Sequence, residues 1–215
     1  MSEKRIPSEA EFERAMVGRH TRPVYDKLKS AYAAVAGLGG LGSNIAVSLA
    51  RAGVGHLLLI DFDRVDITNL NRQQYGVSDI GEYKTEALWR RLSDIAPYAD
   101  IRVKTVKVTE ENAAELFSGY PIVCEAFDGA AEKAMLINTL LSETSDTVIV
   151  SGSGMAGMLS ANTIVTRRAM SRLYVCGDGV TDIADANGLM APRVAVCANH
   201  QANMVLRLIL GETEP

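Results

Sequence analysis

The chain has 215 residues, of which 47% are hydrophobic and 22% are charged, close to the averages of soluble globular domains. This composition excludes a disordered tail, and the length suits one domain with a sizeable core. Lys and Arg number 22 against 26 Asp and Glu, so the net charge is −4 with no long basic run, and we expect no nucleic acid as the main partner.

The first 30 residues are predicted to form a helical arm ahead of the main domain. A helix over 8–19 is indicated by Ser8 and Glu11, which have the spacing of a capping box, and by apolar residues on one face. A second short helix begins near Arg22, where Pro23 suits the first helical position. We therefore divide the chain into an arm, residues 1–30, and a single domain, residues 31–215.

From residue 31 onward, predicted strands and helices alternate. Short apolar strands are indicated at 31–36, 56–60, 121–126 and 147–150, and an alternating, half-exposed strand at 101–108. Helices are indicated between them at 43–52, 83–95, 110–117 and 130–141. The pattern then changes to a strand over 162–166, glycine-rich loops and a last helix from about 194 to 210. This order predicts an α/β fold of the Rossmann-like, doubly wound kind, with a mostly parallel sheet and helices on both faces. Ligand sites of such sheets lie beyond the carboxyl ends of the strands.

A glycine-rich string joins the first of these strands to the helix that follows. Gly37, Gly39 and Gly42 have the G-x-G-x-x-G spacing, and Gly40 lies between them. Glycines there permit a tight turn and a close approach of the backbone to a phosphate, while the helix N-terminus supplies unpaired N–H donors. The string predicts a nucleotide site, although close packing of helix on strand also favours a glycine.

Acidic residues follow the second strand. Asp61 stands at its end, about 20 residues beyond the glycine string, where dinucleotide folds place the carboxylate that meets ribose hydroxyls. A helix or turn cap is the alternative for Asp61. Asp63 either joins the site or only fixes the backbone of the same loop.

The next polar loop decides between a dinucleotide and a triphosphate. It contains Asn69, Arg72 and Gln73; Lys84 follows it, and Asp128 comes after the fourth strand. Arg72 can fork onto phosphate oxygens, Lys84 can act as a compact charge on the leaving group, and Asp128 can hold Mg²⁺. Each charge taken singly could be a solvated surface residue. Together with the glycine string, they predict a site for ATP and magnesium.

These residues occur in an order that resembles the ubiquitin-activating-enzyme-like superfamily, particularly its bacterial ThiF and MoeB members. The resemblance extends from about Tyr32 to Gly211, and the short ending is most similar to the ThiF branch. The strings that carry it are Gly37-Leu-Gly-Gly-Leu-Gly42, Ala52-Gly-Val-Gly55, Asp61-Phe-Asp-Arg-Val65, Asn69-Leu-Asn-Arg-Gln73, Lys84, Met190-Ala-Pro-Arg-Val194 and His200-Gln-Ala-Asn203.

The resemblance implies a homodimeric, ATP-dependent adenylyltransferase. Its substrate would be a ThiS-like sulfur carrier protein ending in Gly-Gly, used in thiamine thiazole biosynthesis, whose terminal carboxylate attacks the α-phosphate of ATP. The glycine loop would then hold the phosphates, Asp61 would bind the ribose, and Asp128 would bind the magnesium ion. Asn69, Arg72 and Lys84 match the family's residues that contact the triphosphate.

The arm departs from the family's pattern. The family places an N-terminal arginine, the second of an Arg-Tyr-x-Arg string, over the phosphates of the partner subunit. Arg19-His-Thr-Arg22 is similar and points to Arg22, but His20 replaces the tyrosine. A solvated arm residue is the alternative for Arg22.

The cysteines depart from it as well. MoeB-like relatives hold a structural zinc with two Cys-x-x-Cys pairs, whereas this chain has only Cys176 and Cys197 in that region, with His200 near the second, so we expect no zinc. Cys176 lies where some relatives link covalently to the carrier, with an inert thiol as the alternative. Because the cysteines are few and scattered and no apolar stretch reaches the roughly 18 residues that cross a bilayer, we expect a cytoplasmic protein without a membrane segment.

Two other functional classes share parts of this pattern. An NAD(P)-dependent oxidoreductase would share the glycine string and Asp61, but the Tyr-x-x-x-Lys spacing occurs only from Tyr25 to Lys29, ahead of that string. A non-catalytic nucleotide-binding protein would keep the fold without needing the charges at Arg72 and Lys84, which this chain has. Within the adenylating class, a tRNA substrate is the alternative to a carrier, and the low basicity gives it little support.

Overall fold

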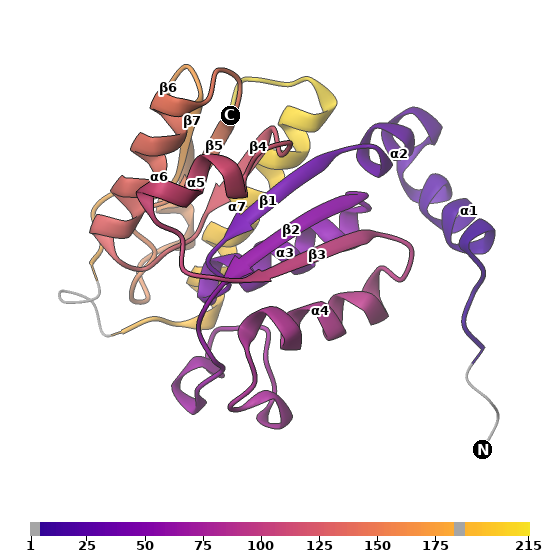
Figure 1. Ribbon diagram of the computed structural model, residues 1–215, viewed down its shortest axis with the longest axis horizontal. Helices are drawn as coiled ribbons and strands as arrows, with labels where there is room; N and C mark the ends of the chain where they lie inside the picture. Colours follow the sequence, from indigo (N-terminus) through magenta and orange to yellow (C-terminus); the bar gives the residue numbers. More distant parts are fainter. Residues whose placement is uncertain (1–4, 183–187) are drawn as a thin grey trace.

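The computed structural model describes residues 5–182 and 188–215, which form a two-helix arm and a seven-stranded sheet covered by helices (Figure 1). The helices are α1 (Glu9–His20), α2 (Arg22–Lys29), α3 (Gly40–Ala52), α4 (Lys84–Ile95), α5 (Glu110–Leu116), α6 (Ala130–Glu143) and α7 (Ala191–Leu210). The strands are β1 (Tyr32–Ala36), β2 (His56–Asp61), β3 (Asp100–Thr105), β4 (Ile122–Glu125), β5 (Val148–Gly152), β6 (Val165–Met170) and β7 (Leu173–Gly177). None of the described helices is long and apolar enough to span a membrane.

The sheet has the strand order β3-β2-β1-β4-β5-β7-β6. All neighbouring strands are parallel except β6, which is antiparallel to β7. The chain moves outward from β1 to β2 and β3, then returns to place β4 on the other side of β1. This reversal confirms the doubly wound prediction, and it makes the gap beyond the carboxyl ends of β1 and β4 the place where such sheets bind ligands.

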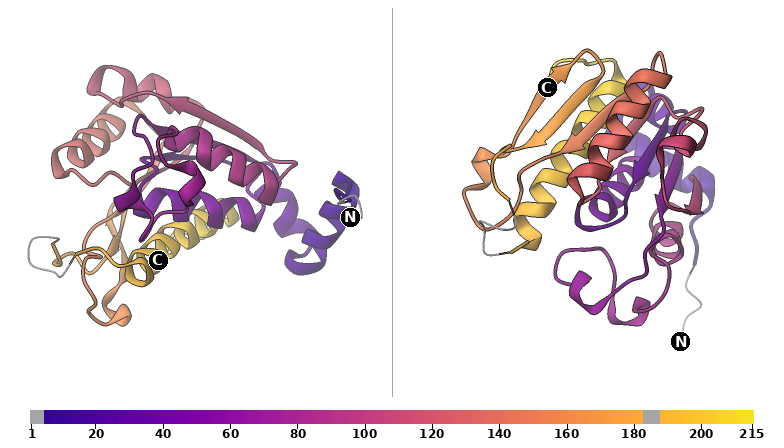
Figure 2. Two further views of the ribbon diagram at one scale, coloured as in Figure 1. Left: turned by 90° about the horizontal axis from the view of Figure 1, so that it is seen from below. Right: turned by 60° about the vertical axis from the view of Figure 1, so that its left-hand side comes forward.

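Helices cover both faces of the sheet, as Figures 1 and 2 show. Along β1, Ala33 and Val35 belong to the core under α3, α4 and α7, whereas Ala34 and Ala36 belong to the core under α5 and α6. Successive side chains of a strand point to opposite faces, so a strand buried on both sides is apolar throughout. The small side chains of β1 thus let two helix layers approach the centre of the sheet.

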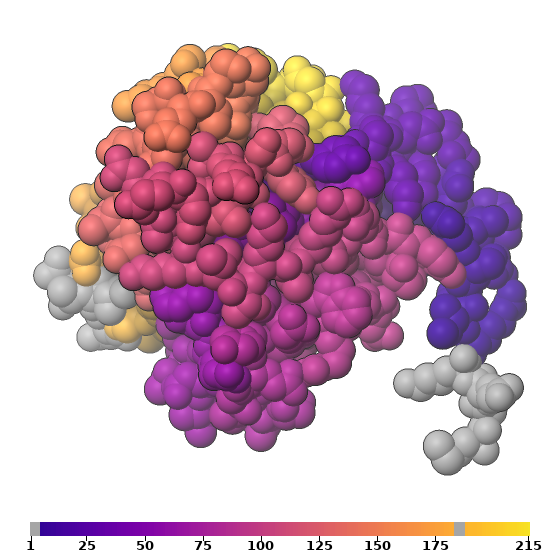
Figure 3. Space-filling view, in the orientation of Figure 1, coloured from indigo at the N-terminus to yellow at the C-terminus, as the bar shows by residue number. Residues whose placement is uncertain are grey.

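The arm packs at the amino ends of the strands. Ser8 caps α1 in a reciprocal capping box with Glu11, as predicted. The Phe12 and Tyr98 rings lie edge to face with centroids 6.0 Å apart, and Lys29 donates to the Tyr98 carbonyl oxygen at 2.6 Å. The space-filling view shows the arm at one edge of the molecule (Figure 3).

Several element bounds differ from the sequence predictions. Helix α3 begins at Gly40 rather than residue 43, because the glycines themselves form its first turn. Residues 162 and 163, predicted as the start of a strand over 162–166, belong to a 3-10 turn over 161–163 that the Ser160 side chain caps, and the strand follows at 165–170. Strand β7 was not predicted, since its core residues show no clear alternation.

Candidate nucleotide site at the strand switch point

The glycine loop is held between the ends of β2 and β4. Gly37 has a φ of +87° and donates its N–H to the Ile60 carbonyl oxygen at 2.8 Å. A Cβ at Gly37 would lie 2.9 Å from both the Ala126 carbonyl oxygen and the Phe127 ring, and a Cβ at Gly42 would lie 1.7 Å from the Gly37 carbonyl oxygen. Two of the glycines are therefore required by the folding of the loop itself.

Gly39 and Gly40 present the more open part of this loop. Gly39 is the N-cap of α3, and no side chain in the described part of the protein caps the helix, so its first N–H groups lack a side-chain acceptor there. The nearest atom to a Cβ at Gly39 would be the Gln73 Nε2, 3.8 Å away. Around Gly40, a Cβ would approach Val194 at 3.1 Å and the Arg72 stem at 3.4 Å. This arrangement suits an anion at the start of α3.

Asp61 braces the loop from the end of β2. Its buried carboxylate accepts from the Leu38 N–H at 2.6 Å through Oδ2 and from the Asp63 N–H at 2.8 Å through Oδ1. In this structure, Asp61 therefore makes the contacts of a turn cap, which was the alternative to a ribose contact. The predicted ribose contact of Asp61 stays a prediction, because each oxygen retains further acceptor capacity.

Lys84 lies beside this turn. It opens α4, its N–H donates to the Asp63 carbonyl oxygen, and its Nζ lies 2.8 Å from the Asp63 Oδ2. The Lys84 side chain is only 8% exposed, whereas that of Asp63 is 50% exposed. A solvated surface lysine, the alternative considered for Lys84, is therefore wrong.

The loop that carries Arg72 is tied to α3. Asn44 donates to the carbonyl oxygens of Gly40 and Arg72, and the Ser43 hydroxyl accepts from the Gln74 N–H. Among the described residues, the guanidinium of Arg72 makes only local bonds, to the Thr68 carbonyl oxygen at 3.0 Å and the Asn71 Oδ1 at 2.8 Å. Arg72 is thus placed at the glycine loop with most of its donors uncommitted.

Gln73 and Asn69 have different roles in that loop. Gln73 is buried, and its Oε1 has no hydrogen-bond partner among the described residues. The Asn69 side chain instead accepts from the Asp66 N–H at 3.0 Å and so completes the cap of a 3-10 turn over 67–69. Of the two amides, Gln73 is the one with unused hydrogen-bonding capacity beside Gly39.

Asp128 follows β4 on the neighbouring strand end. Its carboxylate is exposed and makes no hydrogen bond or ion pair with the described residues. The preceding turn is packed on Gly37 through Ala126 and Phe127. The carboxyl ends of β1, β2 and β4 thus bring together the glycine loop, Asp63 with Lys84, and Asp128.

Comparisons with known proteins identify the family of this chain. The family model described as the ThiF family matches residues 13–215. The chain belongs to the ThiF family. The molybdopterin-synthase adenylyltransferase of Salmonella typhimurium is 30% identical over 196 residues, which cover 88% of this chain and 77% of that protein. The tRNA threonylcarbamoyladenosine dehydratase of Haemophilus influenzae is 34% identical over 141 residues, or 64% of this chain and 54% of the relative.

The fold of this ThiF-family chain also matches solved structures. The crystal structure of the Escherichia coli tRNA N6-threonylcarbamoyladenosine dehydratase superposes with a TM-score of 0.82 at 23% identity, covering 96% of this chain and 98% of that one. At this identity the likeness concerns the fold. By sequence, the matched region is about half the length of the first curated relatives.

Arg22 lies away from the other predicted site residues of this ThiF-family chain. It begins α2, before β1, and the glycine loop follows β1 at the other end of the strand (Figure 1). Its guanidinium pairs with Glu13 at 2.5 Å and Asp26 at 3.4 Å. Within one chain, Arg22 does not join the site, and a role across a dimer stays a prediction.

The three cysteines are buried and unpaired. Burial raises the pKa of the Cys176 thiol to about 11 and that of Cys197 to about 12. A protonated, covered thiol is a poor nucleophile, so the inert alternative fits Cys176 in this conformation. Within the described part of the chain, no group of three or more His, Cys, Asp or Glu side chains could hold a metal ion.

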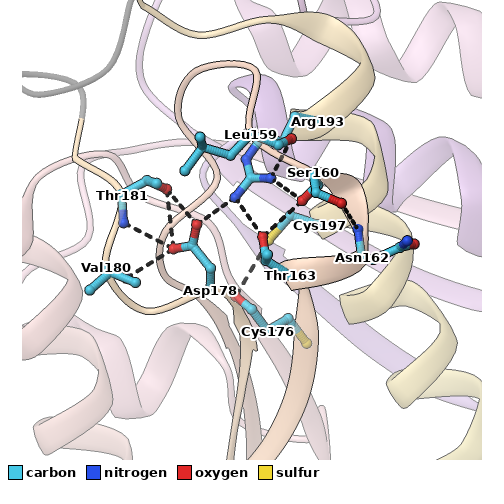
Figure 4. A network of polar contacts seen from close by, with 10 residues as sticks. All are labelled: Leu159, Ser160, Asn162, Thr163, Cys176, Asp178, Val180, Thr181, Arg193 and Cys197. Atoms are coloured by element: carbon cyan, nitrogen blue, oxygen red, sulfur yellow. Dashed lines mark hydrogen bonds and ion pairs between the residues drawn. The ribbon is translucent and has the colours of Figure 1, made fainter.

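Figure 4 shows a buried ion pair, Arg193 with Asp178, that sequence reasoning missed. Arg193, in the first turn of α7, pairs with Asp178 and also donates to the carbonyl oxygens of Leu159 and Ser160. Burial alone would raise the pKa of the Asp178 carboxyl, but hydrogen bonds from Thr181 and the charge of Arg193 hold it below its usual value. The next residue of α7 is the one that packs on Gly40, so this cluster positions α7 against the glycine loop.

Proposed function

We propose that this ThiF-family chain is an ATP-dependent adenylyltransferase that activates a carboxylate by forming an acyl adenylate. The observation that carries the proposal is the convergence of the glycine loop, the buried Lys84, the largely uncommitted Arg72 and the unpartnered Gln73 Oε1 at the strand switch point. The names of the relatives support it, and the E. coli dehydratase structure was solved in complex with AMP.

The described residues fit the groups that this reaction needs. The open start of α3 and the two cations suit a polyphosphate, and the unpartnered Gln73 amide oxygen can accept a hydrogen bond from a bound nucleotide. The exposed Asp128 suits Mg²⁺, which usually takes one or two protein carboxylates together with phosphates and water. When bound there, Mg²⁺ neutralises phosphate charge.

In this reaction the protein positions the reactants and neutralises the negative charge of the phosphates. The start of α3 orients the phosphates, while Arg72 and Lys84 stabilise negative charge that grows on the bridging and leaving oxygens. Asp63 holds the Lys84 ammonium in place until phosphate oxygens compete for it. The acceptor carboxylate attacks the α-phosphate, the bond to the β-phosphate breaks, and pyrophosphate leaves, so no protein nucleophile is needed.

The acceptor we propose first is the C-terminal glycine carboxylate of a ThiS-like sulfur carrier ending in Gly-Gly, in thiamine thiazole biosynthesis. The resemblance of the motif string to the short ThiF branch supports this choice, as does the similarity to a molybdopterin-synthase adenylyltransferase. The same resemblance supports a homodimer in which Arg22 of one chain would reach the phosphates of the other.

A second acceptor is favoured by the comparisons. Several relatives are tRNA threonylcarbamoyladenosine dehydratases, and the threonyl group of that nucleoside carries a free carboxylate that adenylation would activate for loss of water. The net charge of −4 does not favour extensive contact with tRNA, because binding the phosphate backbone requires positive charge. Both acceptors would react with ATP in the same way. They differ only in the molecule that carries the carboxylate.

ATP–pyrophosphate exchange distinguishes these possibilities. The protein is incubated with Mg-ATP and labelled pyrophosphate, with either a Gly-Gly-ended carrier or tRNA bearing threonylcarbamoyladenosine, and the carrier is then weighed by mass spectrometry. We expect exchange and an added AMP with the carrier. Exchange with the tRNA alone would assign the second acceptor, and no exchange with either would favour a non-catalytic nucleotide-binding protein.

The oxidoreductase alternative is tested by nucleotide titration. The Tyr25 side chain is buried and Lys29 donates to the Tyr98 carbonyl oxygen at the amino ends of the strands, so this pair is not placed for hydride chemistry at the glycine loop. Tight binding of NAD(H) without a preference for ATP would nevertheless favour that class over adenylation.

A further inference from the structure

A fully buried carboxylate lies at the end of β4, three residues before Asp128. The Glu125 side chain is 0% exposed, and its two oxygens accept separate sets of hydrogen bonds. Oε1 accepts from the Phe127 N–H at 2.8 Å, whereas Oε2 accepts from the Lys133 Nζ at 2.6 Å and the Ser151 hydroxyl at 2.6 Å. The backbone of Glu125 is also fixed, because Gln201 of α7 donates to its carbonyl oxygen at 3.1 Å.

Burying the Glu125 carboxylate beside the partly exposed Lys133 is an expensive way to stabilise a strand end. The desolvation of a carboxylate and an ammonium group offsets most of their attraction, and apolar residues of similar size often serve stability as well. The Glu125 carboxylate also spans three elements: the turn after β4, helix α6 through Lys133, and β5 through Ser151. These two facts point to a geometric role rather than a purely stabilising one.

The geometry set by Glu125 is that of the turn 126–129. The bond from the Phe127 N–H curls the chain back over the strand end, and the Ala126 N–H pairs with the Ala36 carbonyl oxygen at 2.9 Å. The turn then rests on Gly37, where any Cβ would meet Ala126 and Phe127 at 2.9 Å. The position of this turn relative to the glycine loop is therefore fixed from both sides.

Asp128 lacks such support of its own. It is exposed and makes no hydrogen bond or ion pair with the described residues, so its place beside the glycine loop comes from the backbone of the turn. The Lys133 N–H donates to the Gly129 carbonyl oxygen, which fixes the other end of the same turn. The Glu125 carboxylate thus fixes the start of the segment that carries Asp128 through the Phe127 N–H, and it ties that start to α6, which begins at the segment's other end, through Lys133.

We propose that Glu125 and Lys133 are positioning residues that hold Asp128 in place to bind the metal ion that accompanies the nucleotide at the glycine loop. This inference rests on the proposed function, because the position of the turn 126–129 matters only if a metal–nucleotide complex binds there. Neither residue touches the nucleotide. Their effect is transmitted through the Phe127 amide and the start of α6.

The test measures metal and nucleotide binding separately. Mn²⁺ binding to the full-length protein is followed by electron paramagnetic resonance in the presence of a non-hydrolysable ATP analogue, and analogue binding without metal by calorimetry. Glu125→Gln keeps the size of the side chain but removes its charge. Glu143→Gln, at the exposed far end of α6, is the matched control.

We expect Glu125→Gln to weaken Mn²⁺ binding by about tenfold, the low end of the loss when a residue that supports a metal ligand is replaced, and to leave metal-free analogue binding nearly unchanged. Hydrogen exchange of amides 126–129 should become faster in Glu125→Gln and stay unchanged in Glu143→Gln. If Glu125→Gln does not fold, Ser151→Ala, which removes one hydrogen bond and keeps the ion pair, should show the same changes at a smaller size.

Two results would overturn the inference alone. One is unchanged Mn²⁺ affinity and unchanged exchange at 126–129 in a folded variant. The other is an equal loss of metal and nucleotide binding that follows the loss of thermal stability, which a merely structural role would give. A wild-type protein that binds neither the analogue nor Mn²⁺ would instead remove the proposed function, and this inference with it.

Discussion

The ammonium group of Lys84 is 2.8 Å from the Asp63 carboxylate and is held on a side chain that is 8% exposed. A buried lysine stem with a fixed head is a preorganised cation, because its side-chain entropy has been lost before a ligand arrives. Asp63 is half exposed and can turn toward solvent when phosphate oxygens compete for the ammonium group. The pair therefore marks where the charge of the triphosphate should lie.

Replacing Lys84 tests this cation directly. Lys84→Met keeps the buried stem but removes the charge, and it leaves Asp63 in solvent, so the melting temperature should change little. ATP affinity should fall by about ten- to hundredfold, the value of one charge-assisted contact of about 1.5–3 kcal/mol. Calorimetry with ATP and thermal unfolding give the two quantities. An unchanged ATP affinity would remove Lys84 from the site.

Arg72 should act on the reaction more than on the fold. Its bonds to Thr68 and Asn71 are local and partly exposed, so Arg72→Ala should cost less than about 1 kcal/mol of unfolding free energy. ATP–pyrophosphate exchange should fall by about a hundredfold or more, as when a transition-state donor is lost. Arg64→Ala is the matched control, because Arg64 stacks on Tyr83 in the same loop and donates to the Gly81 carbonyl oxygen. Equal losses in the two variants would contradict the assignment.

Two glycines of one loop should respond differently to an added methyl group. A Cβ at Gly42 would lie 1.7 Å from the Gly37 carbonyl oxygen, so Gly42→Ala should lower stability by about 1–3 kcal/mol or more. At Gly39 the nearest atom is 3.8 Å away, so Gly39→Ala should keep the melting temperature and lose ATP affinity, because the methyl group blocks close approach of a phosphate. Retained ATP affinity in Gly39→Ala would place the phosphates elsewhere.

The buried thiols predict a pH dependence. Because burial raises the pKa of Cys176 to about 11 and that of Cys197 to about 12, both stay protonated in the native state at pH 9, where unfolded thiols begin to ionise. The unfolded state then releases protons that the native state retains, so the free energy of unfolding should fall as the pH rises from about 9 to 11. Iodoacetamide at pH 8 should label these thiols only in denaturant. Rapid labelling of native Cys176 would indicate a reactive thiol.

The ion pair beside α7 should matter for stability. Removing one partner of a buried pair leaves an uncompensated charge, so Arg193→Met should lower the free energy of unfolding by about 3–5 kcal/mol. Adding Asp178→Asn should restore part of that loss, since the stranded carboxylate is then neutral. Chemical denaturation of the single and double variants measures the coupling. Additive losses would show that the two residues act independently.

The fold was predictable because its signals are local. The apolar strands, the capping box at Ser8 and the glycine spacing each involve neighbouring residues, and together they predicted the doubly wound sheet that the structure confirms. The strand ends also indicated where Asp61 and Asp128 would lie, whereas the roles of the site residues toward a nucleotide stay predictions. Spacing alone left open that Asp61 would brace the amides of Leu38 and Asp63.

The missed residues have partners far away in the sequence. Glu125 was read only as part of an apolar strand, and its partner Ser151 lies on another strand. Arg193 was quoted in a motif without a role, since its partners come from the loops before β6 and after β7. The periodicity of apolar residues along the sequence does not indicate contacts between residues so far apart. An Asp or Glu placed directly at the end of a predicted buried strand is the one signal that could have indicated a buried carboxylate.

The most direct test of the account is a crystal structure of the protein with Mg²⁺ and a non-hydrolysable ATP analogue. We predict that the triphosphate lies at the start of α3, with Arg72 and Lys84 on its oxygens and the metal ion beside Asp128. A nucleotide bound elsewhere, or phosphates that leave Lys84 paired with Asp63 and Asp128 pointing into solvent, would contradict it.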